Sequence, residues 1–166
     1  DKNPYAYVAL GFNYYFGQGV EADQAKGKEY FDKAIALGCM DGYYGLGQIA
    51  SDEGDLTTAM EDYEMAAEKG AEPLYMGGAM SQIGGMYYLG IGVEQDYVKA
   101  AEWYEKAANQ GNVDAMTLLG SQYLTGTGTE ENQMEVAKWL QKAADLGNTY
   151  AMLWLGQMNY YANNME

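Results

Sequence analysis

Apolar and small positions recur along the chain with a period of about 36 residues. An apolar residue followed by glycine recurs at spacings of 36, 37, 36 and 36 residues, at Leu10-Gly11, Leu46-Gly47, Ile83-Gly84, Leu119-Gly120 and Leu155-Gly156. A small residue stands four positions before each pair, at Ala6, Gly42, Ala79, Ala115 and Ala151. Because residues three and four apart share one helical face, each pair predicts an amphipathic helix, here called helix A.

A second amphipathic segment, helix B, follows each of the first four pairs. Each begins at a residue whose side-chain oxygen can cap a helix N-terminus, namely Asp23, Asp55, Asp96 and Asn132. Each ends at a glycine suited to the left-handed conformation that follows many helices, namely Gly38, Gly70, Gly111 and Gly147. The pattern predicts one all-α repeat domain, residues 1–166, with helix-turn-helix repeats at about 3–38, 39–70, 71–111 and 112–147 and a half-repeat at 148–166.

The second repeat departs from this pattern. It has thirteen positions from Gly42 to Asp55, where the other repeats have seventeen between the same landmarks, and it lacks their Gly-x-Gly loop. Five extra residues after Gly70 restore the spacing, so we expect a local irregularity there.

The third repeat carries the most complete set of motif residues. It combines Ile83-Gly84 with Tyr87, Gly90-Ile91-Gly92-Val93, Asp96, Lys99-Ala100, Trp103-Tyr104, Lys106-Ala107-Ala108 and Gly111. This order resembles the Sel-one-like repeat (SLR) family, a relative of the tetratricopeptide repeat. The resemblance implies a right-handed α-α superhelical solenoid and a function as an adaptor in protein complexes.

Charge narrows the choice of partners. There are 24 Asp and Glu residues against 9 Lys and Arg, a formal net charge of −15, which repels nucleic acid and anionic membranes. No apolar run is long enough to span a bilayer. The single cysteine, Cys39, fits a reducing compartment, so we expect a soluble protein and favour the cytoplasm while leaving export open.

Catalysis is not expected. The chain has no His, the usual acid or base near neutral pH and the commonest metal ligand, so we predict no cofactor and no metal. The Gly-x-Gly segments lack the strand and third glycine of a phosphate-binding loop, and Cys39 has no His to activate it. A cysteine-rich branch of the SLR family has been linked to β-lactams, which makes a β-lactam hydrolase a remote alternative. None of the serines begins the Ser-x-x-Lys motif of such enzymes.

The resemblance also implies a binding groove lined by helix A. In tetratricopeptide-like arrays, the lining positions lie two and five residues to either side of the Leu-Gly anchor. The candidate partner-binding residues are Tyr5, Val8, Phe12, Tyr15, Tyr44, Gln48, Ser81, Tyr88, Thr117, Leu124, Tyr150, Leu153 and Tyr160. Because these positions are rich in Tyr and contain no Lys, the hypothesis is a groove for a neutral or basic peptide or protein segment.

Two alternatives remain. The groove tyrosines could simply pack between adjacent A helices, as we expect of the core residues Tyr14, Tyr87, Tyr123, Trp103 and Trp139. The chain would then be a structural spacer or an oligomerisation segment. Its final half-repeat leaves Met152, Trp154, Leu155 and Tyr160 without a helix B, so we expect either a segment of a longer array or self-association through this half-repeat.

Overall fold

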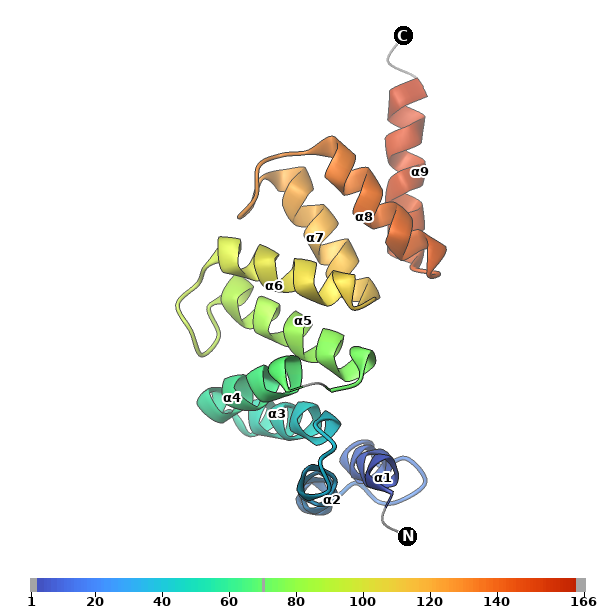
Figure 1. Cartoon of the computed structure of the whole chain (residues 1–166). Helices are drawn as coiled ribbons and strands as arrows, with labels where there is room; N and C mark the ends of the chain where they lie inside the picture. The colour runs from blue at the N-terminus through green and yellow to red at the C-terminus, as the bar shows by residue number, and fades with distance from the viewer. Residues whose placement is uncertain (1–2, 70, 164–166) are drawn as a thin grey trace. The chain divides into compact units, whose positions relative to one another are not determined.

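The computed structural model describes residues 3–69 and 71–163, with side chains as far as Tyr160. The described residues form nine α-helices and no strand (Figure 1), which confirms the all-α prediction. The helices are α1 (Pro4–Phe16), α2 (Gln24–Ala36), α3 (Asp41–Glu53), α4 (Leu56–Glu68), α5 (Pro73–Leu89), α6 (Tyr97–Asn109), α7 (Val113–Thr125), α8 (Gln133–Asp145) and α9 (Thr149–Asn163). Odd-numbered helices are the predicted A helices, and even-numbered helices are the B helices.

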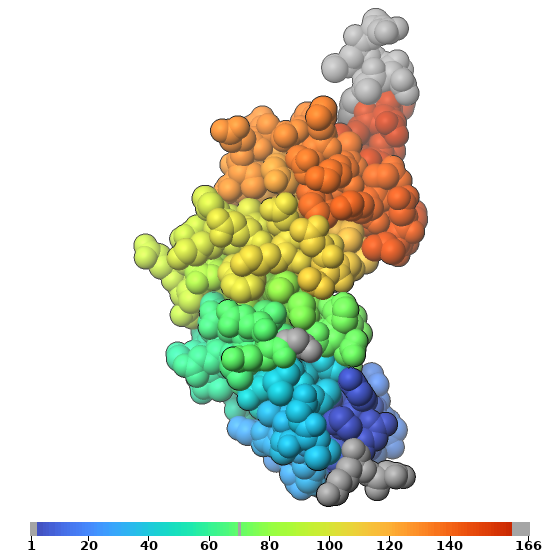
Figure 2. Space-filling model, in the orientation of Figure 1, coloured from blue at the N-terminus to red at the C-terminus, as the bar shows by residue number. Residues whose placement is uncertain are grey.

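The chain divides into two compact units, Asp1–Ile83 and Gly84–Glu166, and the boundary falls inside α5. In the first unit, α1 packs on α2 and α3, α2 packs on α3, and α3 packs on α4. In the second unit, α6 packs on α7, α7 on α8, and α8 on α9. Figure 2 shows the side chains of neighbouring helices, such as α7 and α8, meeting in one continuous surface. Apart from the contact between α1 and α3, these pairs join helices that follow one another in sequence.

Local signals set the helix ends as predicted. The predicted capping residue precedes α2, α4, α6 and α8, and in each case its side chain accepts a hydrogen bond from a backbone N–H of the first turn. Gly38, Gly111 and Gly147 follow three of these helices with φ angles of 86°, 88° and 89°. Gly70, the fourth predicted terminator, lies outside the described residues.

The second repeat differs at both of the places that the sequence indicated. Only Gly54 and Asp55 separate α3 from α4, whereas the loops after α5 and α7 are long excursions in Figure 1. The extra residues after position 70 are partly helical, because α5 has 17 residues where α1, α3 and α7 have 13. The insertion thus adds about one turn to the N-terminal end of α5.

A bulky side chain from helix B packs against a glycine of helix A in each complete repeat. Phe31, which is completely buried, lies against Gly11 of α1 and Gly45 of α3. The corresponding pairs are Gly47 with Tyr63, Gly84 with Tyr104, and Gly120 with Leu140. Helix A therefore needs glycine at this position so that the two helices can approach closely.

Most of the aromatic residues assigned to the core by sequence are only half-buried, so that prediction is wrong for Tyr14, Tyr87, Tyr123 and Trp103. It is confirmed for Trp139, which is 1% exposed. Three of these rings lie at the surface of the repeat, where they are in contact with lysine ammonium groups. Lys26 lies 5.3 Å from the Tyr14 ring centroid, Lys99 5.1 Å from that of Tyr87, and Lys106 4.0 Å from that of Trp103.

No helix in the described part of the chain is long and apolar enough to cross a membrane.

Candidate functional site

The first unit brings aromatic side chains from three A helices together. Phe12 of α1 and Tyr44 of α3, both predicted groove residues, have ring centroids 6.2 Å apart. Tyr75 of α5 completes the group, because its ring is stacked on Phe12 at 5.6 Å with an interplanar angle of 5° and lies 5.9 Å from Tyr44. Sequence reasoning missed Tyr75, although the five-residue insertion that carries it was a visible signal.

A second aromatic pair extends this group at the C-terminal end of α1. The Phe16 ring lies 4.6 Å from Tyr15 and 6.0 Å from Phe12. The Tyr15 hydroxyl donates a 2.7 Å hydrogen bond to Asp52 of α3, and Gln24 approaches the same carboxylate oxygen at 3.4 Å. Burial and the Asp52 carboxylate raise the pKa of Tyr15, so its hydroxyl stays protonated and remains a donor.

We call the set formed by Tyr5, Phe12, Tyr15, Phe16, Tyr44 and Tyr75 the aromatic surface. Its two ends are exposed, because Tyr5 is 56% and Phe16 57% accessible to solvent, while the residues between them are half-buried. Tyr5, Phe12 and Phe16 share a face of α1 because they are separated by seven and four residues. Contact between rings from different helices makes the surface continuous across α1, α3 and α5.

Polar side chains form hydrogen bonds with Tyr44 at the centre of the aromatic surface. The Gln48 amide donates a 3.1 Å hydrogen bond to the Tyr44 hydroxyl. Burial raises the pKa of Tyr44, and a hydrogen bond with the Gln82 side chain partly opposes this effect. Tyr44 is thus held in a neutral, hydrogen-bonded state beside the stacked rings of Phe12 and Tyr75.

Some predicted groove residues do not contribute to a surface of this kind. Val8 is 2% exposed, so its assignment as a partner contact is wrong: it faces the core of the first unit, in the same apolar cluster as Phe31. Ser81 is half-buried in the first unit. In the second unit, Thr117 is half-buried and uses its hydroxyl within its own helix, donating to the carbonyl of Val113 at 3.1 Å.

The remaining predicted positions lie in the second unit. Tyr88 is 36% exposed, and its ring lies 5.1 Å from that of Tyr97. Leu124 lines an open pocket of about 210 Å³ with three residues of α9, Trp154, Gln157 and Met158. Three further predicted residues of α9 are strongly exposed: Tyr150 at 73%, Leu153 at 57% and Tyr160 at 66%.

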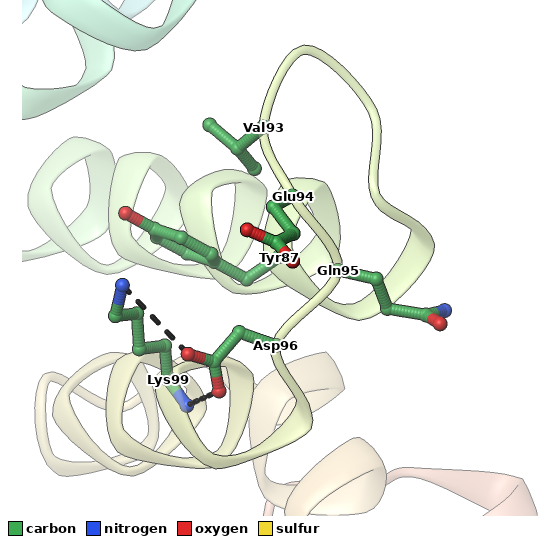
Figure 3. Close-up of a pocket in the computed structure, with 6 residues that line it drawn as sticks. All are labelled: Tyr87, Val93, Glu94, Gln95, Asp96 and Lys99. Atoms are coloured by element: carbon green, nitrogen blue, oxygen red, sulfur yellow. Dashed lines mark hydrogen bonds and ion pairs between the residues drawn. The ribbon is translucent and has the colours of Figure 1, made fainter.

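A polar pocket recurs at the loop between helix A and helix B. In the third repeat, its volume is about 430 Å³ and it is lined by Tyr87, Val93, Glu94, Gln95, Asp96 and Lys99 (Figure 3). The Lys99 ammonium lies over the Tyr87 ring and 3.7 Å from an Asp96 carboxylate oxygen. A pocket of about 530 Å³ in the first repeat has the equivalent residues, with Lys26 over Tyr14 and 3.5 Å from Asp23. The chain's own lysine therefore neutralises the carboxylate in each, and we interpret both pockets as loop-anchoring structures.

Little in the described residues points to metal or thiol chemistry. No cluster of three or more Cys, Asp or Glu side chains in ranges 3–69 and 71–160 is arranged to hold a metal ion. Cys39 is 7% exposed, and burial is the main cause of its raised pKa. A raised pKa leaves less of the reactive thiolate at neutral pH.

A model of the Sel1 repeat matches residues 4–39, 78–112 and 113–148, well over half of the chain. The chain belongs to the Sel1 repeat family. Residues 40–77, which include the short connection between α3 and α4 and the additional turn of α5, lie outside the matched residues. No curated protein matched the chain.

Solved structures agree with the Sel1 repeat assignment. A Sel1 repeat protein from Oxalobacter formigenes is 34% identical with a TM-score of 0.76, and the match covers 95% of this chain and 45% of that one. The protective antigen c5321 of uropathogenic Escherichia coli, which displays an SLR fold, is 30% identical with a TM-score of 0.80 over 98% of this chain and 35% of its own. Cysteine-rich protein B of Helicobacter pylori is 27% identical with a TM-score of 0.62 over 82% and 97% of the two chains.

These matches confirm an all-α solenoid of helix-turn-helix repeats. The chain spans less than half the length of the first two structures. Sel1 repeats generally serve as scaffolds for protein–protein interaction, and proteins built from them are typically non-catalytic.

Proposed function

We propose that this Sel1 repeat chain is a non-catalytic adaptor that binds a peptide or protein segment across the aromatic surface of the first unit. The observation that carries the proposal is the continuity of that surface, in which rings from α1, α3 and α5 lie 4.6 to 6.2 Å apart. Tyr and Phe side chains supply large contact areas at a low cost in conformational entropy, and aromatic residues are enriched in the energetic centres of protein interfaces.

The charge of the chain indicates which segments would bind. With a net charge of −15, the protein attracts basic segments, repels acidic ones and has no net charge interaction with neutral ones. The aromatic surface contains no Lys that could hold a partner's carboxylates, and Asp52 is hydrogen-bonded at its edge. We therefore expect the bound segment to combine apolar side chains with positive charge.

A second candidate function, self-association through the last half-repeat, rests on α9. A Cβ added at Gly156 would meet nothing within 4 Å, whereas the equivalent glycines of the other A helices contact a bulky side chain of helix B. Tyr150, Met152 and Leu153 of α9 are at least half exposed. In the other repeats a helix B side chain covers the equivalent glycine, so this candidate function places a helix of a second copy against Gly156.

Site-directed photo-crosslinking tests the adaptor proposal. A benzophenone amino acid replaces Phe16 in one variant and Leu146 in the other, because these side chains have matched exposures of 57% and 59% and only Phe16 belongs to the aromatic surface. We expect a cell-derived partner to crosslink at position 16 and not at position 146. The affinity of that purified partner is then measured for the intact chain and two substituted forms.

We expect the combined substitution Tyr5→Ser and Phe16→Ser to weaken binding by about tenfold or more, in line with the loss of aromatic contacts at an interface. Leu146→Ser is the matched control and should leave the affinity unchanged. Equal crosslinking at both positions, or an affinity that does not respond to the double substitution, would contradict the proposal. A dimer that Gly156→Leu disrupts would favour self-association instead.

A further inference from the structure

We propose that the end of the aromatic surface formed by Tyr5, Asp41, Glu72 and Tyr75 receives a cationic side chain, arginine or lysine, of the bound segment. This inference rests on the proposed function and makes it more specific, because it places the positive charge of the partner at one end of the surface. We call these four residues the cation seat.

Four residues from three elements meet at the cation seat. Tyr5 lies in the first turn of α1, and Asp41 is the first residue of α3. Glu72 directly precedes α5, and its backbone N–H donates a 2.8 Å hydrogen bond to Asp41 Oδ1. Tyr75 lies in the extra turn of α5, so the insertion that distinguishes this repeat also supplies half of the seat.

Asp41 is the unusual member of this group. It is 2% exposed, and its second carboxylate oxygen, Oδ2, is buried and accepts no hydrogen bond from an N–H or O–H group of the described residues. The Cys39 thiol, a weak donor, lies beside this carboxylate. A buried carboxylate oxygen without a partner is unfavourable, because desolvation is not offset by a hydrogen bond or an opposite charge. A nearby positive charge would offset part of this cost.

The negative charge of Asp41 contributes to the raised pKa values of Tyr5 and Tyr75. Glu72 is the main cause of the raised pKa of Tyr5, with Cys39, burial and Asp41 as further causes. Burial is the main cause of the raised pKa of Tyr75, and the Asp41 charge is the second cause. The Asp41 carboxylate therefore lies among residues of α1, α5 and the segment that precedes α3.

The described part of the chain shows no ion pair at these carboxylates. Among the ion pairs of residues 3–69 and 71–160, none includes Asp41 or Glu72. In the third repeat, by contrast, a tyrosine ring and a carboxylate share a cation from the chain itself. Figure 3 shows the Lys99 ammonium between the Tyr87 ring and the Asp96 carboxylate. The cation seat has the tyrosine rings and the carboxylates of that arrangement, and the bound segment would supply the positive charge.

Amide NMR spectra of the full chain provide the test. The probes are N-acetyl-arginine amide and N-acetyl-citrulline amide, which have nearly the same shape and differ in charge. We expect the arginine probe to shift the amide signals of residues 5, 39–41, 72, 74 and 75, and the citrulline probe to leave them in place.

Glu72→Gln removes one charge while keeping the backbone N–H that binds Asp41, and it should reduce the initial slope of the shifts by about tenfold. Glu64→Gln, an equal charge change at an exposed position of α4, is the control and should keep the slope. The inference is wrong if citrulline acts like arginine, if neither probe shifts these signals, or if Glu72→Gln has no effect. If a crosslinked partner still depends on Phe16 in that case, the adaptor proposal stands and only the cation seat fails.

Discussion

Replacing Gly45 with alanine should destabilise the first unit, although alanine favours a helix more than glycine does. Gly45 lies inside α3 and faces the Phe31 ring of α2. A Cβ at this position would come within 2.5 Å of Phe31 Cε1, and ordinary carbon–carbon contacts are roughly 3.5–4.0 Å. The ring has little room to move away, because Phe31 is fully buried and a Cβ at Gly11 of α1 would also lie 2.5 Å from it.

The magnitude follows from two opposing effects. The change from Gly to Ala in a helix interior contributes about 1 kcal/mol of stability. Overpacking a buried site costs about 1–3 kcal/mol, and an overlap of about 1 Å against a confined ring falls at the upper end of that range. We therefore expect a net loss of about 2 kcal/mol in the free energy of unfolding.

Urea denaturation followed by circular dichroism measures this loss. With an m-value of about 2 kcal/mol/M, the midpoint should fall by about 1 M. Gly156→Ala is the control, since its Cβ would meet nothing within 4 Å, and it should raise the midpoint slightly. Adding Phe31→Leu to Gly45→Ala should cost less than the sum of the two changes, because the smaller side chain relieves the overlap. A midpoint that stays the same or rises in Gly45→Ala would refute the packing of Phe31 against α3.

Two further predictions concern a loop and a buried carboxylate. Gly128→Ala should lower the melting temperature more than Gly19→Ala. Both glycines have positive φ (76° and 74°), but only at Gly128 would a Cβ collide with the Tyr97 carbonyl. Equal decreases in melting temperature would exclude this contact. Burial, opposed by Lys28, raises the pKa of Asp62 from 3.8 to about 6. The folded protein therefore holds a proton in this window that the unfolded chain releases, and the contribution of Asp62 to stability falls as pH rises from about 4 to 6. Asp62→Asn should flatten the profile of unfolding free energy against pH between about pH 4 and 6. It should also stabilise the protein at pH 7 by less than about 1 kcal/mol, because solvent screens this half-exposed group. An unchanged profile would contradict the raised pKa of Asp62.

The aromatic surface could be predicted only in part. The helix A register placed Tyr5, Phe12, Tyr15 and Tyr44 at groove positions, and all four belong to the surface. Phe16 follows Phe12 by one turn, so the helical period alone could have added it. Tyr75 could not be placed in this way, because the insertion gave no register until α5 showed that it forms an additional helical turn.

The sequence by itself determined the number of helices and most of their ends. Capping by Asp96 and termination at Gly111 depend on backbone and side-chain groups within one turn, so they can be recognised without knowledge of the packing. Which aromatic residue enters the core was decided by the tertiary structure. Trp103 and Tyr104 are adjacent and both apolar, yet Tyr104 is 3% exposed because it faces Gly84 of the neighbouring helix, whereas Trp103 turns outward beneath Lys106. Adjacent helical positions point about 100° apart, so only contact with another helix determines which of them is buried.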